Sequence, residues 1–245
     1  MTDDRRPTTD SPHLLVFAKE PVAGRVKTRL APALGAAGAA RLYEAFLEDL
    51  GLVLDRLGRG RVTWFVDGDP AHPSFRGRDV RAQAGGDLGH RLEGAFAWAF
   101  SQGPGPVAVI GSDSPLLEPG HLDGLLGAVA GPDEAAVIPA DDGGYTGLAL
   151  GAPCPAAFRG IAWSTGGVLG QTLRALEAAG FRVRVLAAVP DVDEPADLRR
   201  LARRLRERPG LAPHTFRALG LRVSERPHSS APPAGSPRRD PAKTR

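Results

Sequence analysis

The stretch LLVFAKEPVAGRVKTRL, residues 14–30, decides how the rest of the chain is interpreted. It opens with the apolar run LLVF, which predicts a short, buried parallel strand. A loop broken by proline and glycine follows, and it carries Arg25, Lys27 and Arg29 within five residues. A strand that leads through a glycine-containing basic loop into a helix is an arrangement with which α/β proteins bind phosphate. A solvated, charged surface loop explains these residues equally well, so the remaining sequence must separate the two interpretations.

The size and composition of the chain favour an ordinary intracellular α/β protein. Its 245 residues are enough for one α/β domain with a sizeable core. No apolar run approaches the roughly 18–20 residues of a membrane span, and the polar start of the chain is unlike a signal peptide. The single cysteine, Cys154, excludes an intrachain disulfide and a cysteine zinc site. We therefore expect a cytoplasmic, soluble protein without a membrane span.

The high pI of about 9.5 comes mostly from the C-terminal tail. Residues 222–245 contain six Lys or Arg and two acids, whereas the whole chain has a net charge of +3. Residues 1–221 therefore carry a net charge of −1. Because nucleic-acid binding requires a basic face on the folded part, nucleic acid is not an expected partner.

Strand and helix patterns alternate along the chain. Short apolar or alternating runs predict strands at 14–17, 62–66, 79–83, 107–110, 135–139, 145–150 and 182–189. Apolar residues at helical spacing predict helices at 36–57, 88–100, 119–129 and 165–179, and a last one that begins at Pro195. This alternation predicts a three-layer α/β fold, with a mostly parallel sheet covered by helices on both faces. The polar ends predict a disordered arm over 1–12 and a disordered tail over 222–245, around a single domain at 13–221.

Charged residues follow several of the predicted strands. Asp113 comes after the strand at 107–110, Asp142 lies between two later strands, and Asp191 and Asp193 follow the last one. Ligands of open α/β sheets bind outside the carboxyl ends of the strands, so these carboxylates and the basic loop should meet there. Basic side chains can neutralise a diphosphate, and two carboxylates can hold a hard divalent metal that phosphate and water also coordinate.

Each of these residues also has a simpler structural explanation. Asp113 can cap the following turn, and Asp193, which precedes Glu-Pro, is by itself better explained as the N-cap of the last helix. The pair Gly143-Gly144 is typical of a tight hairpin, and Trp163 of a core or lid residue. The functional interpretation therefore depends on the combination of these residues and on their common location.

Six motifs together resemble one bacterial family. They are FAKEPVAGRVKTRL, QAGGDLGHRL, IGSDSPLL, DDGGYTGLAL, IAWSTGGVL and DVDEPADL, which span about residues 14–201. In this order they resemble the small GT-A-fold glycosyltransferases, some of them labelled as arsenosugar-biosynthesis enzymes. The fold is also similar to that of the molybdopterin guanylyltransferase and 2-phospholactate guanylyltransferase families. The resemblance implies a nucleotide-diphospho-sugar transferase type of domain.

The resemblance also implies roles for individual residues. Asp113 and Asp193 would bind Mg²⁺ or Mn²⁺, and Asp113, Asp142 and Lys27 would be catalytic. The expected nucleotide-binding residues are Lys19, Gly24, Arg25, Lys27, Thr28, Arg29, Asp87 and Ser112. The expected acceptor pocket consists of Asp142, Gly143, Gly144, Tyr145 and Trp163.

The chain departs from the family pattern at two places. Ser114 stands where the family often has cysteine, and Thr146-Gly147 replaces a bulky residue beside the expected acceptor pocket. Because the second difference lies beside the expected acceptor pocket, the resemblance says less about which acceptor is used than about how the donor is bound.

Three functions are compatible with this site. The first is metal-dependent transfer of a sugar from a nucleotide-diphosphate sugar to a small-molecule acceptor, which the opening AKEP favours because nucleotidyltransferases usually open with a glycine-rich loop. The second is nucleotidyl transfer, of the guanylyltransferase kind, from a nucleoside triphosphate to a phosphorylated small molecule with release of pyrophosphate. The third is nucleotide binding without catalysis by a regulator.

Overall fold

The computed structural model describes residues 11–58 and 60–222, so the predicted arm and tail lie almost entirely outside the described residues. The strands are β1 (His13–Lys19), β2 (Arg61–Asp67), β3 (Val80–Ala82), β4 (Val107–Gly111), β5 (Glu134–Pro139), β6 (Tyr145–Leu150) and β7 (Arg182–Val185). The α-helices are α1 (Ala31–Asp55), α2 (Leu88–Ser101), α3 (Pro119–Gly127), α4 (Val168–Ala178), α5 (Pro195–Glu207) and α6 (Pro213–Ala218). Short 3₁₀ helices occupy Thr28–Leu30, Pro73–Phe75 and Pro155–Ala157.

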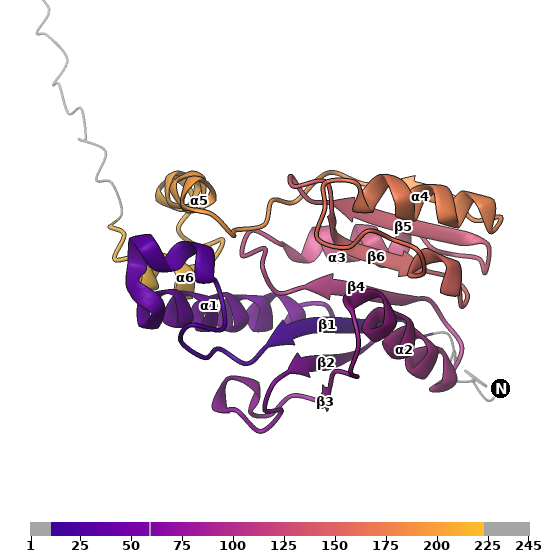
Figure 1. The fold of residues 1–245 in the computed structure, drawn as a ribbon, viewed down its shortest axis with the longest axis horizontal. Coiled ribbons are helices and arrows are strands. Elements are labelled where there is room, and N and C mark those ends of the chain that lie inside the picture. The colour runs from indigo at the N-terminus through magenta and orange to yellow at the C-terminus, as the bar shows by residue number, and fades with distance from the viewer. Residues whose placement is uncertain (1–10, 59, 223–245) are drawn as a thin grey trace, which may run out of the picture.

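The strands form one sheet in the order β3-β2-β1-β4-β6-β5-β7, and Figure 1 shows β3 at one edge and β5 towards the other. β1 pairs in parallel with β2 and with β4, and β7 pairs in parallel with β5. β6 is antiparallel to both of its neighbours, β4 and β5. The mostly parallel α/β sheet predicted from the sequence is confirmed.

Helices cover both faces of the sheet because the central strands are apolar on both sides. In β1, Leu14 and Val16 pack with helices α1, α3, α5 and α6 in one core cluster. Leu15, the residue between them, packs with α2 and α4 in the other cluster. Successive side chains of a strand point to opposite faces, so a strand that is covered on both faces reads as a continuous apolar run.

The last strand is shorter than the prediction of 182–189. β7 ends at Val185, although Leu186 N–H and Val189 N–H still donate to carbonyl groups of β5 at 2.8 and 3.0 Å. Strand β5 ends at Pro139, so the partner for further pairing ends there. The chain then crosses the sheet towards the end of β4, and this crossing carries Asp191 and Asp193 into the candidate site.

Helix α6 was not predicted, because its six residues are too few for a periodic pattern. Asp49, which is buried in α1, accepts hydrogen bonds from the backbone N–H groups of His214 and Thr215 at 2.9 and 2.8 Å. This carboxylate takes up two N–H groups at the start of α6 that the helix itself cannot satisfy. The contact fixes the end of the described chain against α1. Within the described residues, no helix combines the length and apolarity that crossing a membrane requires.

Candidate functional site

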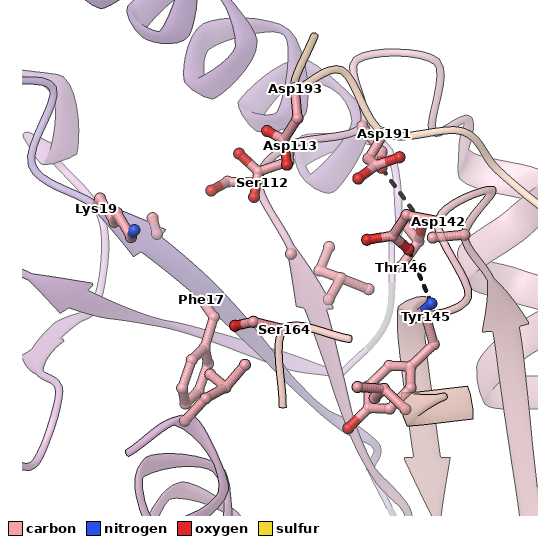
Figure 2. Close-up of a pocket in the computed structure, with 18 of the residues that line it drawn as sticks. Phe17, Lys19, Ser112, Asp113, Asp142, Tyr145, Thr146, Ser164, Asp191 and Asp193 are labelled. Atoms are coloured by element: carbon pink, nitrogen blue, oxygen red, sulfur yellow. Dashed lines mark hydrogen bonds between the residues drawn. The ribbon is translucent and has the colours of Figure 1, made fainter. Parts of the chain in front are cut away.

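A cavity of about 430 Å³ opens at the carboxyl ends of β1 and β4. The predicted site residues that line it are Lys19, Lys27, Ser112, Asp113, Asp142, Gly144, Tyr145, Trp163 and Asp193. They come from six separate segments of the chain, and Figure 2 shows Lys19 on one side, Asp142 and Asp191 on the other, and Asp113 and Asp193 between them. The structure therefore brings together most of the residues that the sequence placed in one site.

Lys27 connects the basic loop to the acidic side of the cavity. Its backbone is left-handed, with φ 47° and ψ 41°, immediately before the 3₁₀ turn at Thr28–Leu30. This conformation is uncommon for a residue other than glycine and turns the side chain inwards, where it is 3% exposed. The ammonium nitrogen Nζ lies 2.5 Å from Asp113 Oδ1 and 2.8 Å from Asp193 Oδ1. Burial lowers the pKa of Lys27, but the attraction of the two carboxylates outweighs it and holds the pKa above its ordinary value, so the group is charged.

Neither aspartate has the capping role that explains it more simply. Glu194 and Asp197 form a capping box at the start of α5, which leaves the side chain of Asp193 to contact Lys27. Val192 N–H donates to the carbonyl of Asp113 at 3.0 Å, so the crossing segment is fastened directly to the end of β4. The two carboxylates are 48% and 44% exposed, and both open on the cavity.

This pair of carboxylates suits a hard divalent cation. Among the described residues there is no group of three or more His, Cys, Asp or Glu side chains placed to hold a metal. Mg²⁺ is commonly held by one or two carboxylates together with substrate phosphates and water, so two half-exposed aspartates are a fitting donor set. The Oδ1 atoms of Asp113 and Asp193 both contact Lys27 Nζ, so Lys27 sets the distance between the two carboxylates.

Ser112 and Tyr43 form a buried polar pair under Lys27. The Tyr43 hydroxyl lies 2.7 Å from Ser112 Oγ and accepts a hydrogen bond from the backbone N–H of Lys19 at 2.9 Å. Burial, with a smaller contribution from Asp113, raises the pKa of Tyr43 above its ordinary value, so the hydroxyl stays protonated. The pair links the ends of β1 and β4 to helix α1.

A second group of acids lies on the β6 side of the cavity. Asp142 Oδ1 accepts from Gly144 N–H at 2.8 Å in the turn between β5 and β6, and Asp191 lies near it on the crossing segment (Figure 2). Burial, together with the charges of Asp142 and Asp193, raises the pKa of Asp191 to about 6. Among the described residues, no cation lies within ion-pair distance of either carboxylate.

Gly143 and Gly144 form the hairpin turn that their sequence predicts, and Gly143 has a further role. Its φ is +86°, and a Cβ there would lie 2.2 Å from the carbonyl oxygen of Gly166. Leu169 N–H also donates to the Gly143 carbonyl at 2.9 Å. Gly143 therefore lets the turn pack against the segment before α4 and does not itself line the cavity.

The segment before α4 forms one wall of the cavity with Trp163 and Ser164. The Trp163 ring packs edge-on against Tyr145, with 6.4 Å between ring centroids. It also lies so close to α2 that a Cβ at Gly89 would be 2.5 Å from its Nε1. Ser164 follows in a left-handed conformation with φ 63° and lines the cavity. Trp163 is half-buried and also lines the cavity, so it fits both the core or lid residue and the pocket residue that the sequence predicts.

Five of the predicted nucleotide-binding residues lie outside this cavity, and four of them belong to the basic loop. Arg25 is 3.8 Å from Glu20 and lines a smaller cavity of about 200 Å³ next to Lys19. Arg29 is 3.6 Å from Glu194, and its side chain is 72% exposed. Gly24 takes the turn of the loop with φ +80°, and Thr28 begins the 3₁₀ helix. Of the three loop cations, the structure thus turns Lys27 inwards and leaves both arginines at the surface.

Asp87 is the N-cap residue of helix α2. Its carboxylate accepts from His90 N–H at 2.8 Å and caps α2, as its position in the sequence also predicts. Asp87 is not among the residues that line the cavity, although its neighbour Leu88 is, so a nucleotide contact of Asp87 stays a prediction. The loop before it is held by Arg91, which donates to the Gly86 carbonyl at 2.9 Å and pairs with Asp67 at 3.0 Å.

The two departures from the family pattern are in contact with each other. Ser114 Oγ lies 3.4 Å from Thr146 Oγ1, and Thr146 donates to the carbonyl of Val189 at 2.8 Å. Both side chains are buried and line the cavity. Next to them, a Cβ on Gly147 would lie 3.0 Å from Leu125 and 3.3 Å from Ile110. The replacements are therefore one local change that makes the cavity polar beneath Asp142 and Asp191.

The fold is of the nucleotide-diphospho-sugar transferase type, and comparison with known proteins places the chain in a family. Residues 41–165, just over half of the chain, match the family described as "Uncharacterized protein conserved in bacteria (DUF2064)", and the chain belongs to that family. A phosphoenolpyruvate guanylyltransferase from Rubrobacter xylanophilus is 34% identical to it, over 76% of this chain and 93% of the relative.

Solved structures agree with this type of fold. A protein from Desulfovibrio desulfuricans G20 described as a nucleotide-diphospho-sugar transferase is 32% identical, with a TM-score of 0.79 over 85% of this chain and 94% of that one. A nucleotidyl transferase from Methanothermobacter thermautotroptrophicus shares the fold at 16% identity, with a TM-score of 0.52 over 84% of this chain and 98% of the other. The nucleotide-diphospho-sugar transferase type of fold expected from the sequence is confirmed.

Three of the polar residues that line the cavity are not assigned to the site by the sequence motifs. Asp191 was noted after the last strand, but its nearness to Asp142 depends on where the chain crosses the sheet. Tyr43 lies in the apolar stripe of a predicted helix, and nothing in that pattern indicates a polar contact with Ser112. The unusual feature of Ser164 is its left-handed backbone. The sequence STGG does not predict it, because a left-handed conformation there would be expected at one of the two glycines instead.

Proposed function

We propose that the chain is a metal-dependent nucleotidyltransferase, which joins the nucleotide of a nucleoside triphosphate to a phosphorylated small molecule. The observation that carries the proposal is the contact of buried Lys27 with Asp113 and Asp193 at the carboxyl ends of the strands, where phosphate and a divalent cation would bind. The similarity to a guanylyltransferase supports nucleotidyl over glycosyl transfer, and it makes GTP the first donor to test.

In the proposed reaction, a phosphate oxygen of the acceptor attacks the α-phosphorus of the triphosphate. The bond between the α-phosphorus and the bridging oxygen of the β-phosphate breaks, and pyrophosphate leaves with that electron pair. The triphosphate enters along the end of β1, where Lys19 faces the cavity without an ion-pair partner among the described residues. Arg25, at the adjoining small cavity, can contact the leaving pyrophosphate, since the two cavities share Lys19.

Lys27 has two functions in this proposal. It holds Asp113 and Asp193 at a fixed spacing, and its charge adds to the positive potential that the attacked phosphate meets. Asp113 and Asp193 would hold Mg²⁺ or Mn²⁺, which supplies charge neutralisation for the leaving pyrophosphate when bound. Asp142, Tyr145 and Trp163 lie on the far side of the cavity and would contact the acceptor.

A product assay tests the proposal directly. The full chain is incubated with each nucleoside triphosphate, Mg²⁺ and a mixture of phosphorylated small molecules, and pyrophosphate is measured together with the mass of any new nucleotide conjugate. We expect pyrophosphate to form only when metal and acceptor are both present, and Asp113→Asn to abolish it. Metal-dependent nucleotide binding without any product, in every mixture, would contradict the proposal and favour a non-catalytic regulator.

Glycosyl transfer is the second candidate, and the similarity to the D. desulfuricans protein favours it. An acceptor hydroxyl oxygen would then attack the anomeric carbon of the sugar, the bond from that carbon to the diphosphate would break, and the hydroxyl proton would pass to a base such as Asp142. The same assay with nucleotide-diphosphate sugars separates the two reactions, because glycosyl transfer releases a nucleoside diphosphate and nucleotidyl transfer releases pyrophosphate.

A further inference from the structure

The charges of the cavity are unevenly distributed. The charged side chains among its described lining residues are Lys19, Lys27, Asp113, Asp142, Asp191 and Asp193, which give a formal charge of −2. Both cations belong to the first-strand side: Lys19 ends β1, and Lys27 is already in contact with Asp113 and Asp193. Within the described part of the chain, the two acids on the opposite side, Asp142 and Asp191, have no cation within ion-pair distance, although the charge of Lys27 acts on Asp191 from further away.

The other groups on this side are hydrogen-bonding or aromatic rather than cationic. Ser164 and Thr165 line the wall, Thr146 and Ser114 form a buried hydroxyl pair, and the rings of Tyr145 and Trp163 pack edge-on beside them. Carboxylates and hydroxyls accept hydrogen bonds from donors such as alcohols and amines. A ring face beside them suits the C–H surface of a compact polyol.

We infer that the acceptor of this chain is a phosphorylated polyol or other neutral, hydroxyl-bearing phosphate ester, and not a phosphorylated carboxylic acid such as phosphoenolpyruvate. The inference rests on the proposed nucleotidyl transfer. The acceptor phosphate lies towards the metal and the lysines, so the remainder of the molecule extends over Asp142 and Asp191. A carboxylate there would meet two like charges, whereas hydroxyl groups would donate hydrogen bonds to both.

This inference separates the chain from its guanylyltransferase relative, which is named for an acceptor that carries a carboxylate. The polar contact between Ser114 and Thr146 belongs to the same cavity. These side chains form the part of the cavity beneath Asp142 and Asp191, the two carboxylates that would bind the acceptor hydroxyls.

The test uses two acceptors that differ at one end. Glycerol 3-phosphate and 3-phosphoglycerate have the same phosphate ester, but one ends in a hydroxymethyl group and the other in a carboxylate. With Mg²⁺ and its nucleoside triphosphate, we expect the full chain to use glycerol 3-phosphate with a kcat/KM at least about tenfold higher than that for 3-phosphoglycerate. A factor of that size corresponds to the cost of one contact between like charges. Asp142→Asn should narrow this ratio at least about threefold, by improving the carboxylate acceptor.

Asp141→Asn is the matched control, because it removes the same charge from the neighbouring residue, which does not line this cavity. It should leave the ratio unchanged. Equal or better use of 3-phosphoglycerate, or a ratio that Asp142→Asn does not move, would overturn the inference.

Binding separates this inference from the proposed function. Calorimetry with Mg²⁺ and a non-transferable α,β-methylene analogue of the triphosphate measures the affinity for each acceptor without turnover. Tighter binding of glycerol 3-phosphate, even with no product, would support the acceptor class while contradicting nucleotidyl transfer. Binding of neither acceptor, or a preference for 3-phosphoglycerate, would overturn the inference.

Discussion

Replacing Lys27 with methionine removes the cation between two carboxylates while keeping most of the side-chain volume. Asp113 Oδ1 and Asp193 Oδ1 lie 2.5 and 2.8 Å from Nζ, so at most about 5.3 Å separates them. Two unit charges at that distance repel by about 1 kcal/mol at the dielectric of water and by about 3 kcal/mol at an effective dielectric of 20. The Lys27 side chain is 3% exposed, but both acids are nearly half exposed, so water takes up part of this repulsion.

We therefore expect Lys27→Met to lower the free energy of unfolding by about 2 to 4 kcal/mol, including the two lost charge-assisted hydrogen bonds. For a domain of this size, that is a fall in Tm of about 5 to 15 °C. Millimolar Mg²⁺ should raise the Tm of the variant more than that of the wild type, because a cation bound to the two aspartates replaces the missing charge. Thermal and urea unfolding, each with and without Mg²⁺, measure both effects.

Lys19→Met is the matched control for this experiment. Lys19 lines the same cavity but is exposed and has no ion-pair partner among the described residues, so its loss should change stability by less than about 0.5 kcal/mol. A loss in Lys27→Met as small as that of the control would refute the reasoning. So would a Mg²⁺ effect no larger than in the wild type.

Two further predictions concern the scaffold of the site. Burial, and secondarily Arg61, lowers the pKa of His13 from its ordinary 6.5 to about 4. Between these two pH values the unfolded chain binds a proton at this histidine and the folded chain does not. Stability therefore falls as the pH drops from 6.5 towards 4. Urea unfolding should show that the free energy of unfolding falls by about 2 kcal/mol between pH 7 and pH 5, and that His13→Gln removes this fall. The same pH dependence in the variant would exclude His13 as its source. Gly143→Ala should cost about 2 to 4 kcal/mol, because its Cβ would lie 2.2 Å from the Gly166 carbonyl, whereas Gly160→Ala, with a similar positive φ and no atom within 4 Å, should cost about 1 kcal/mol. Equal losses in these two variants, measured by thermal unfolding, would show that backbone strain alone decides.

The fold and the principal residues of the site were accessible from the sequence because both depend on local patterns. Buried strands read as continuous apolar runs, and the alternation with helices fixes a mostly parallel sheet. Parallel strands present their carboxyl ends at one edge, so residues that follow different strands were expected to meet there. The sequence therefore predicts that Lys27, Asp113 and Asp193 lie at the same edge of the sheet.

What the sequence could not determine are contacts that depend on where distant segments cross. Lys27 and Asp193 are 166 positions apart, and their contact requires the chain to leave the sheet after β7 and bind to the end of β4. Glu194 rather than Asp193 takes the cap of α5 because Asp197 completes a reciprocal capping box with it. Sequence spacing alone does not decide between two adjacent acids before a proline.

The stretch at residues 14–30 shows most clearly which features the sequence determines and which only the tertiary structure decides. Its composition alone predicts a basic segment after a buried strand, and a phosphate site and a charged surface loop explain that segment equally well. Tertiary structure decides that Lys27 turns inwards through a left-handed backbone, while Arg25 and Arg29 stay at the surface beside Glu20 and Glu194. The physical reason is that a buried ammonium is stable only where carboxylates surround it, and those carboxylates come from the far end of the chain.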